Sequence, residues 1–199
     1  TTVGAILTTR RTIGNAVALM VMSAAFLPYL GSSERMYGEI YDYGDTFFLF
    51  FASSAIVMAG FTLAFARMVK AIGTRRTMAG VFILLVVASG VNLLVTVLAD
   101  GVPAFVFFYL ATTLLISLQT SLSPLLTSGA LDEVGYAAGT AASTIGVISL
   151  LGGALLSPFV DSAIGSTITP FALGFFVFSL LAALAAGWAN TGRSVARAA

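Results

Sequence analysis

The residues best able to do chemistry lie in one apolar segment, 102–128, whose second half is crowded with hydroxyl and amide side chains. At helical spacing several members of this segment fall on or near one stripe: Phe105, Tyr109, Thr112, Gln119 and Ser123. Gln119 lies near mid-membrane depth, and Pro124 leaves a nearby backbone carbonyl without its helical partner. The stripe predicts a polar cavity in which Tyr109, Thr112, Gln119 and Ser123 contact a small-molecule substrate.

A simpler interpretation of the same segment remains open. Ser and Thr hydroxyls in an apolar helix commonly bond carbonyls of their own helix, and a Gln commonly bonds a neighbouring helix. For any single hydroxyl of the segment we favour this local bonding, whereas for the stripe as a whole we favour the cavity.

A second candidate stripe lies in the first apolar segment, 13–30, where aromatic and polar side chains alternate at helical spacing. Within it, Ser23 and Phe26 are the residues that we expect to contact an apolar ligand in the same cavity. Core packing of these side chains is the simpler alternative.

The sequence lacks most catalytic chemistry. It contains no His and no Cys, which removes imidazole catalysis, thiolate chemistry and the usual zinc ligands. No Asp, Glu, Lys or Arg falls in the middle of an apolar segment, and no phosphate-binding glycine loop or Ser/His/Asp set is present. We therefore expect no enzyme activity, no cofactor, no metal and no proton-carrying site in this chain.

Composition assigns the chain to the lipid bilayer. Hydrophobic residues make up 59% and charged residues 9% of the sequence, against roughly 25% charged in soluble domains. Six segments approach the roughly 20 apolar residues that a spanning helix needs: 13–30, 46–68, 77–99, 102–128, 136–160 and 168–189. The runs are continuously apolar rather than alternating, so we predict one all-α bundle of six transmembrane helices over 1–199 and not a barrel.

Charge asymmetry predicts the orientation. Eight of the nine basic residues fall in the termini or in the connection at 67–76, on one predicted side of the membrane. The other side holds one basic residue, Arg35, beside six acidic ones. Because basic loops stay in the cytoplasm, both termini are predicted to be cytoplasmic. The connection at 129–135 is expected on that side as well, although it carries two acidic residues and no basic one.

The remaining segments differ in their surfaces. The third and sixth spans are apolar nearly all round, as lipid-facing helices are. The fifth span carries small residues at close-packing spacing, and those expected to contact another unit are Gly139, Ser143, Gly146 and Gly153. Packing inside the six-helix unit is the equal alternative. The polar stretch 31–45, with three Tyr residues, is predicted to be an outer loop with interfacial anchors, with a short amphipathic turn as an alternative within it.

The short basic connection between the second and third spans has a distinctive pattern. Its positions are Arg67, Lys70, Gly73, Arg75 and Arg76. This pattern resembles the loop motif between the second and third helices of each half of the major facilitator superfamily. The stretch 42–50 is similar to that family's entrance to the eighth helix. The stretches 138–146 and 152–158 resemble the eleventh helix of its bicyclomycin-resistance-like drug:proton antiporters.

The resemblance covers essentially the whole chain and implies the C-terminal half of a twelve-helix transporter. It implies that the first and fourth spans line a central cavity, that the second and fifth pack on an N-terminal six-helix half, and that the third and sixth face lipid. We accordingly expect a piece of a longer protein of the plasma (inner) membrane, with proton-coupled efflux of small amphipathic solutes or drugs. The alternative is a stand-alone six-helix protein that homodimerises through the fifth span as a scaffold or pore.

Overall fold

The computed structural model describes residues 10–131 and 138–190, which form helices joined by short turns, with no β-strand among them. Six helices are long and apolar enough to cross a membrane, which confirms the six predicted spans. They are α2 (Arg10–Arg35), α3 (Phe47–Ile72), α4 (Thr74–Leu98), α5 (Phe105–Leu131), α6 (Ala138–Asp161) and α7 (Thr169–Asn190). The fold is therefore that of an all-helical, multi-pass membrane protein.

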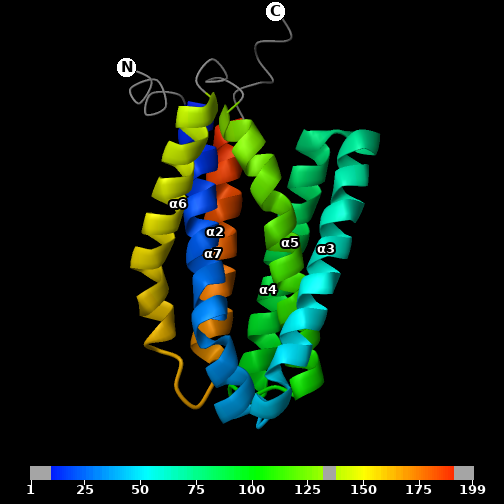
Figure 1. Ribbon diagram of the computed structural model, residues 1–199, viewed down its shortest axis with the longest axis vertical. Coiled ribbons are helices and arrows are strands. Elements are labelled where there is room, and N and C mark those ends of the chain that lie inside the picture. The colour runs from blue at the N-terminus through cyan, green and yellow to red at the C-terminus, as the bar shows by residue number, and fades with distance from the viewer. Residues whose placement is uncertain (1–9, 132–137, 191–199) are drawn as a thin grey trace, which may run out of the picture.

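The helices form two layers (Figure 1). The front layer runs in the order α6, α2, α5, α3, and each neighbouring pair is in contact. The back layer consists of α7 and α4, which pack on each other and on α2 and α5 respectively. The two central helices, α2 and α5, are thus enclosed on three sides, and each leaves one face at the front of the bundle.

The main helix contacts are symmetric. When α2, α3 and α4 are exchanged for α5, α6 and α7, the pairs α2–α6 and α2–α7 become α5–α3 and α5–α4, which are also in contact. The pairs α2–α5 and α4–α7 map onto themselves. Because successive helices alternate in direction, the two triplets have opposite orientations in the membrane. The pattern of helix pairs is therefore that expected of two triplets in inverted orientation, here called the two repeats.

The two ends of the bundle carry opposite charge. One end, here called the hinge end, holds the start of α2, the connection Ile72–Thr74 and the end of α7, all at the top of Figure 1. The described basic residues except Arg35 lie there, namely Arg10, Arg11, Arg67, Lys70, Arg75 and Arg76. The opposite end, called the distal end, holds Arg35 and every described acidic residue. Residues 132–137 and 191–199, which contain two acidic and two basic residues of the predicted asymmetry, lie outside the described part of the chain.

The predicted outer loop at 31–45 is largely helical instead. Helix α2 continues to Arg35 and passes directly into a π-helical turn, Met36–Ile40. Tyr37 in this turn is fully buried. Its ring contacts four others: Phe47, Phe50, Phe105 and Phe108. The prediction of a loop was wrong at 31–40, where the chain is helical and the rings of Tyr37 and Tyr41 pack between the starts of α3 and α5, while Tyr43 is exposed.

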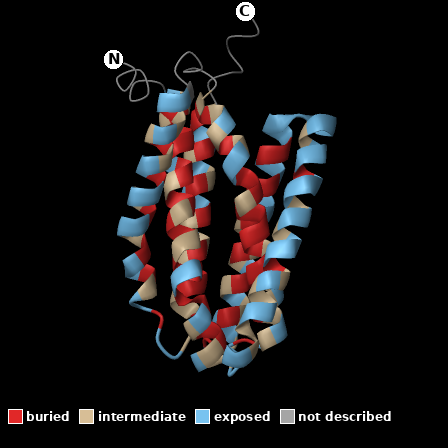
Figure 2. Ribbon diagram, in the orientation of Figure 1, coloured by how far each residue is buried: buried red, intermediate tan, exposed pale blue. Residues whose placement is uncertain are grey.

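Burial differs sharply among the helices (Figure 2). In the most apolar stretch of α2, 61% of the residues are buried, and in that of α5 56% are, against 6% in α3. Among the residues of α3 only Ser54 and Phe65 are buried. Helices α4 and α7 each bury one face against the other and expose the opposite face. The bundle core thus forms around α2 and α5, while α3 presents nearly its whole surface.

Candidate functional site

A cavity of about 150 Å³ lies between the two central helices. It is lined from α2 by Leu19, Met22, Ser23 and Phe26, and from α5 by Gln119, Thr120 and Ser123. Four of the six residues predicted to contact substrate therefore meet here: Ser23, Phe26, Gln119 and Ser123. Apolar and polar side chains share the lining, so the cavity suits a molecule with both kinds of surface.

Gln119 is the central polar group of this cavity. It lies at the middle of α5 and is only 5% exposed. Its amide nitrogen donates a hydrogen bond to the carbonyl of Met22, so that it ties α5 to α2. Its carbonyl oxygen has no partner among the described residues. Because an unsatisfied buried acceptor costs about 1–3 kcal/mol, this oxygen is a favourable place for a ligand to donate a hydrogen bond.

Most hydroxyl groups of the site already use their protons locally. Ser23 donates to the carbonyl of Leu19 at 3.0 Å, and Thr120 donates to the carbonyl of Ile116 at 2.9 Å. This is the local bonding given above as the simpler interpretation. A hydroxyl that donates its proton still has lone pairs to accept with. The cavity therefore presents acceptors more than donors.

Pro124 adds a further acceptor. It lies inside α5 and has no N–H, so the carbonyl of Thr120, four residues earlier, loses its usual helical partner. Helix α2 carries a proline in its second half too, Pro28. Both central helices are continuous, and each carries a proline at a corresponding place in its triplet.

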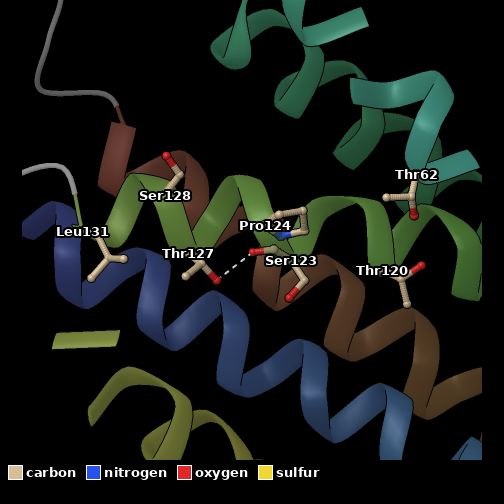
Figure 3. Close-up of a pocket in the computed structure, with 7 residues that line it drawn as sticks. All are labelled: Thr62, Thr120, Ser123, Pro124, Thr127, Ser128 and Leu131. Carbon is tan, nitrogen blue, oxygen red and sulfur yellow. Dashed lines mark hydrogen bonds between the residues drawn. The ribbon is translucent and has the colours of Figure 1, made fainter. Parts of the chain in front are cut away.

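An open groove of about 960 Å³ continues from the cavity toward the hinge end, between α5 and α3 (Figure 3). The two hollows share Thr120 and Ser123. Thr62 lines the groove from α3, and the other lining residues come from α5: Thr120, Ser123, Pro124, Thr127, Ser128 and Leu131. The lining carries hydroxyl groups but no charge. Together the cavity and the groove form one path from the hinge end to the middle of the bundle, and we call it the polar path because hydroxyl and amide groups line it beside a larger apolar surface.

Two residues predicted for the cavity lie elsewhere. Tyr109 lies in the distal half of α5, where its hydroxyl is 2.8 Å from the hydroxyl of Ser53 in α3. Thr112 is buried, lines none of the hollows described here, and its hydroxyl has no partner among the described residues. Next to it, the hydroxyls of Ser54 and Thr113 are 2.9 Å apart. The distal part of the predicted stripe therefore joins α5 to α3.

Sequence reasoning missed the contribution of α3 to this site. Thr62 is a single hydroxyl on an apolar helix, and it donates to the carbonyl of Met58 at 2.9 Å. Its position in the sequence does not distinguish Thr62 from a Thr that faces lipid. The usable signal was in α5, where the hydroxyl run continues through Thr127 and Ser128 beyond the predicted stripe.

The basic connection is a hinge of one residue. Helix α3 ends at Ile72 and α4 begins at Thr74, so Gly73 alone joins them. Its φ of 87° and ψ of 155° fall in a region that is essentially restricted to glycine. The four cations of the motif are exposed around it: Arg67, Lys70, Arg75 and Arg76.

The predicted packing residues of α6 divide into two groups. A Cβ added to Gly139 or Gly146 would meet nothing within 4 Å, and Ser143 is exposed, so these three leave an open face. Gly153 is buried against α2 instead, because a Cβ there would lie 2.6 Å from the Cβ of Ser23. Gly153 therefore belongs to the packing inside the unit.

The fold and the site define a class of protein: a helical membrane protein with a polar path among six apolar helices. Comparison of the chain with protein-family models, with curated proteins and with solved structures gave no match in any of the three. The resemblance to the major facilitator superfamily rests on the motifs themselves.

Proposed function

We propose that the chain is one half of a secondary transporter that moves small amphipathic organic solutes or drugs by alternating access. The observation that carries this proposal is the polar path to Gln119 in a bundle whose helices are otherwise apolar. Polar groups are rare inside transmembrane bundles, and where they face a cavity they often mark a route for solute.

The inverted arrangement of the two triplets supports the same function. Many secondary transporters are built from inverted repeats, and their substrate sites lie near the midplane on interrupted helices. Here α2 and α5 are continuous but each contains a proline, Pro28 and Pro124, and Gln119 is at the middle of α5. This supports a cavity that is exposed alternately to the two sides of the membrane.

The lining indicates the chemistry of the solute. Leu19, Met22 and Phe26 give an apolar wall, and Gln119 and Thr120 offer acceptors. The matching solute has an apolar body and hydrogen-bond donors, as organic amines and alcohols do. No acidic side chain lines the cavity, so a permanent positive charge on the solute is not specifically recognised.

In this proposal the missing partner is a second six-helix half. The exposed surface of α3 and the open face of α6 would be covered by it, and a proton-carrying group would belong to it, since no charged residue lies in the middle of the described spans. The hinge end would face the cytoplasm of a cell whose plasma (inner) membrane holds the transporter, with the basic connection at the gate.

The test is the substitution Gln119→Ala in the full-length protein. We expect a three- to ten-fold change in the efflux of fluorescent amphipathic amines, the size of one neutral hydrogen bond, at unchanged expression. Asn92→Ala is the control, because Asn92 is also a buried amide but lines none of the described hollows. Equal transport by wild type and Gln119→Ala would remove Gln119 from the substrate site.

A homodimeric scaffold or pore is the second candidate, favoured by the open face around Gly139 and Gly146. The chain has no cysteine, so a single Ser143→Cys substitution gives an unambiguous cross-linking site. Disulfide-linked dimers of intact protein in membranes would support the homodimer. Cross-linking only to a cysteine in another six-helix unit would support the transporter.

A further inference from the structure

A second hollow lies on the back layer, away from the proposed transport path. It is an apolar groove of about 500 Å³ between α4 and α7. Small residues leave this space in the half near the hinge end: Ala79, Ala183, Ala186 and Gly187. Toward the distal end the two helices close up, since a Cβ on Gly90 would already lie 3.3 Å from the ring of Phe176. The groove is therefore confined to the hinge half of the bundle.

The length of the groove matches one leaflet of a bilayer. Along α4 it extends from Arg75 to Val87. At 1.5 Å per residue this is about 18 Å. Half of the roughly 30 Å hydrocarbon core is about 15 Å. A single acyl chain running along the groove would thus reach from the headgroup level to about the bilayer centre.

The hinge end of the groove opens into a polar cavity of about 260 Å³. The two hollows share Arg75, Met78 and Asn190. The polar cavity is also lined by the guanidinium-bearing Arg11 and by two hydroxyl residues, Thr74 and Ser128. Arg75 is exposed and makes no hydrogen bond or ion pair with the described residues. The polar cavity therefore offers arginine and hydroxyl donors next to an apolar channel.

The charge around the polar cavity favours a negatively charged ligand. Every described acidic residue lies at the distal end, whereas Arg11 and Arg75 line the polar cavity at the hinge end. Arg75 also stands in the first turn of α4, where the helix dipole favours an anion. Guanidinium groups bind phosphate oxygens in a bidentate manner. The polar cavity is thus complementary to a phosphate group.

We propose that this composite site binds an anionic glycerophospholipid from the leaflet at the hinge end. The phosphate is held by Arg75 and Arg11 in the polar cavity, and one acyl chain lies in the groove between α4 and α7. Basic pockets between transmembrane helices bind such headgroups in general. The proposal does not depend on the chain being a transporter, since the acyl-chain groove lies between α4 and α7, although the polar cavity shares Ser128 with the groove of the transport path.

The experiment measures lipid retention by the detergent-purified protein with native mass spectrometry, after addition of phosphatidylglycerol or phosphatidylcholine. Wild type is expected to retain phosphatidylglycerol in preference. Arg75→Gln is expected to lower this retention about five-fold or more, as the loss of one cation near an anionic leaflet does. Arg76→Gln is the matched control, because Arg76 is an exposed neighbour of equal charge that lines neither hollow.

A second pair of variants tests the acyl chain. Gly187→Leu places a side chain in the groove without changing charge, and a Cβ there meets nothing within 4 Å, so the fold should accept it. Retention of phosphatidylglycerol should fall, while Gly80→Leu, also in open space but outside the groove, should leave it unchanged. If Gly187→Leu fails to fold, Ala79→Leu blocks the same groove.

Four outcomes would overturn the proposal. Equal retention of the two lipids would show that the charge is not recognised. Equal losses for Arg75→Gln and Arg76→Gln would indicate diffuse attraction to the basic end. Glycerol phosphate without acyl chains that competes as well as phosphatidylglycerol, or full retention by Gly187→Leu, would show that the groove holds no chain.

Discussion

The two helices at the edges of the front layer, α3 and α6, occupy equivalent positions in the two repeats but are held very differently. Helix α6 packs tightly on α2, where the backbones approach closely at Gly153. Helix α3 buries two residues and contacts α5 mainly in its distal half, through Ser53 and Ser54. Beyond these contacts the groove separates α3 from α5.

The difference indicates which of the two edge helices, α3 or α6, is suited to move or to bind a partner. An apolar helix with little packing inside its own bundle is covered by lipid or by another protein. Helix α3 is hydrogen-bonded to α5 in its distal half and joined to α4 by one residue, and in its hinge half only Phe65 is buried. In the proposed transporter this is the gate side of the path.

The largest expected effect comes from forcing α6 away from α2. Gly153→Leu places atoms where a Cβ alone would lie 2.6 Å from Ser23 and 3.1 Å from the backbone of Ala24. Overpacking of this kind costs about 3 kcal/mol. We expect a strongly lowered midpoint of thermal unfolding in detergent. Gly60→Leu on α3, where a Cβ meets nothing within 4 Å, should leave the midpoint unchanged. Equal changes in the unfolding midpoint for the two variants would contradict the claim that α6 is packed more tightly than α3.

The second effect concerns the connection that positions α3. In Gly73→Ala a Cβ is forced into a backbone conformation with φ of 87°, which costs about 1–3 kcal/mol. Gly80→Ala, in the helix interior of α4, should instead be neutral or stabilising by up to about 1 kcal/mol. Urea or thermal unfolding measures both. A neutral Gly73→Ala would mean that the hinge relaxes to an ordinary conformation.

A smaller effect is expected from the polar link between α3 and α5. Ser53→Ala removes the hydrogen bond to Tyr109, and interhelical hydrogen bonds in membranes average about 0.6 kcal/mol. A double-mutant cycle with Tyr109→Phe should give a coupling energy of this size. Thr62→Ala in the groove removes a bond within α3 only, so its coupling to Tyr109→Phe should be zero. A measurable coupling energy between Thr62→Ala and Tyr109→Phe would show that the hinge half of α3 is held to α5 as the distal half is.

The smallest effect is a loss of folding stability at high pH, and it comes from Tyr41, just before α3. Burial raises the pKa of Tyr41 above its ordinary value of 10.0, so the folded protein keeps this phenol protonated when the unfolded chain ionises. Its contribution to stability is therefore complete below pH 10 and declines as pH rises further. Tyr41→Phe keeps the stacked ring on Phe108 and should match wild type at pH 7 but decline less steeply above pH 10. The exposed Tyr43→Phe serves as the control; the same flattening in it would contradict the assignment.

Much of the fold could be predicted from the sequence, because the length of each apolar run and the distribution of charge can be read directly along the chain. The six spans follow from runs of apolar residues, and the meeting of Ser23 with Gln119 follows from two helical stripes that each need a polar environment. These are consequences of local periodicity. The loop predicted at 31–45 was wrong over 31–40, because a polar stretch rich in Tyr fits a loop as well as it fits a helical turn with a buried aromatic cluster.

Spacing alone also could not assign the small residues of α6 to a neighbour. Gly146 and Gly153 share one spacing pattern, yet one faces open space and the other faces α2. The choice depends on the rotation of α6, which is set by residues such as Ile145 that pack into the core. The groove at Thr62 was missed for a related reason, since it depends on how far α3 stands from α5.

The most direct test of the central claim, a polar path that reaches the middle of the bundle, is the labelling of Ser123→Cys by a membrane-impermeant maleimide from the hinge side. Ser123 lies about 12 Å from the end of α5 at 1.5 Å per residue. A thiol reacts only where water allows it to ionise. We predict rapid labelling of Ser123→Cys and none of Leu84→Cys, which is exposed on α4 at a similar depth but faces the bilayer. Equal, slow labelling of both would show that the groove is filled by lipid and would contradict the polar path.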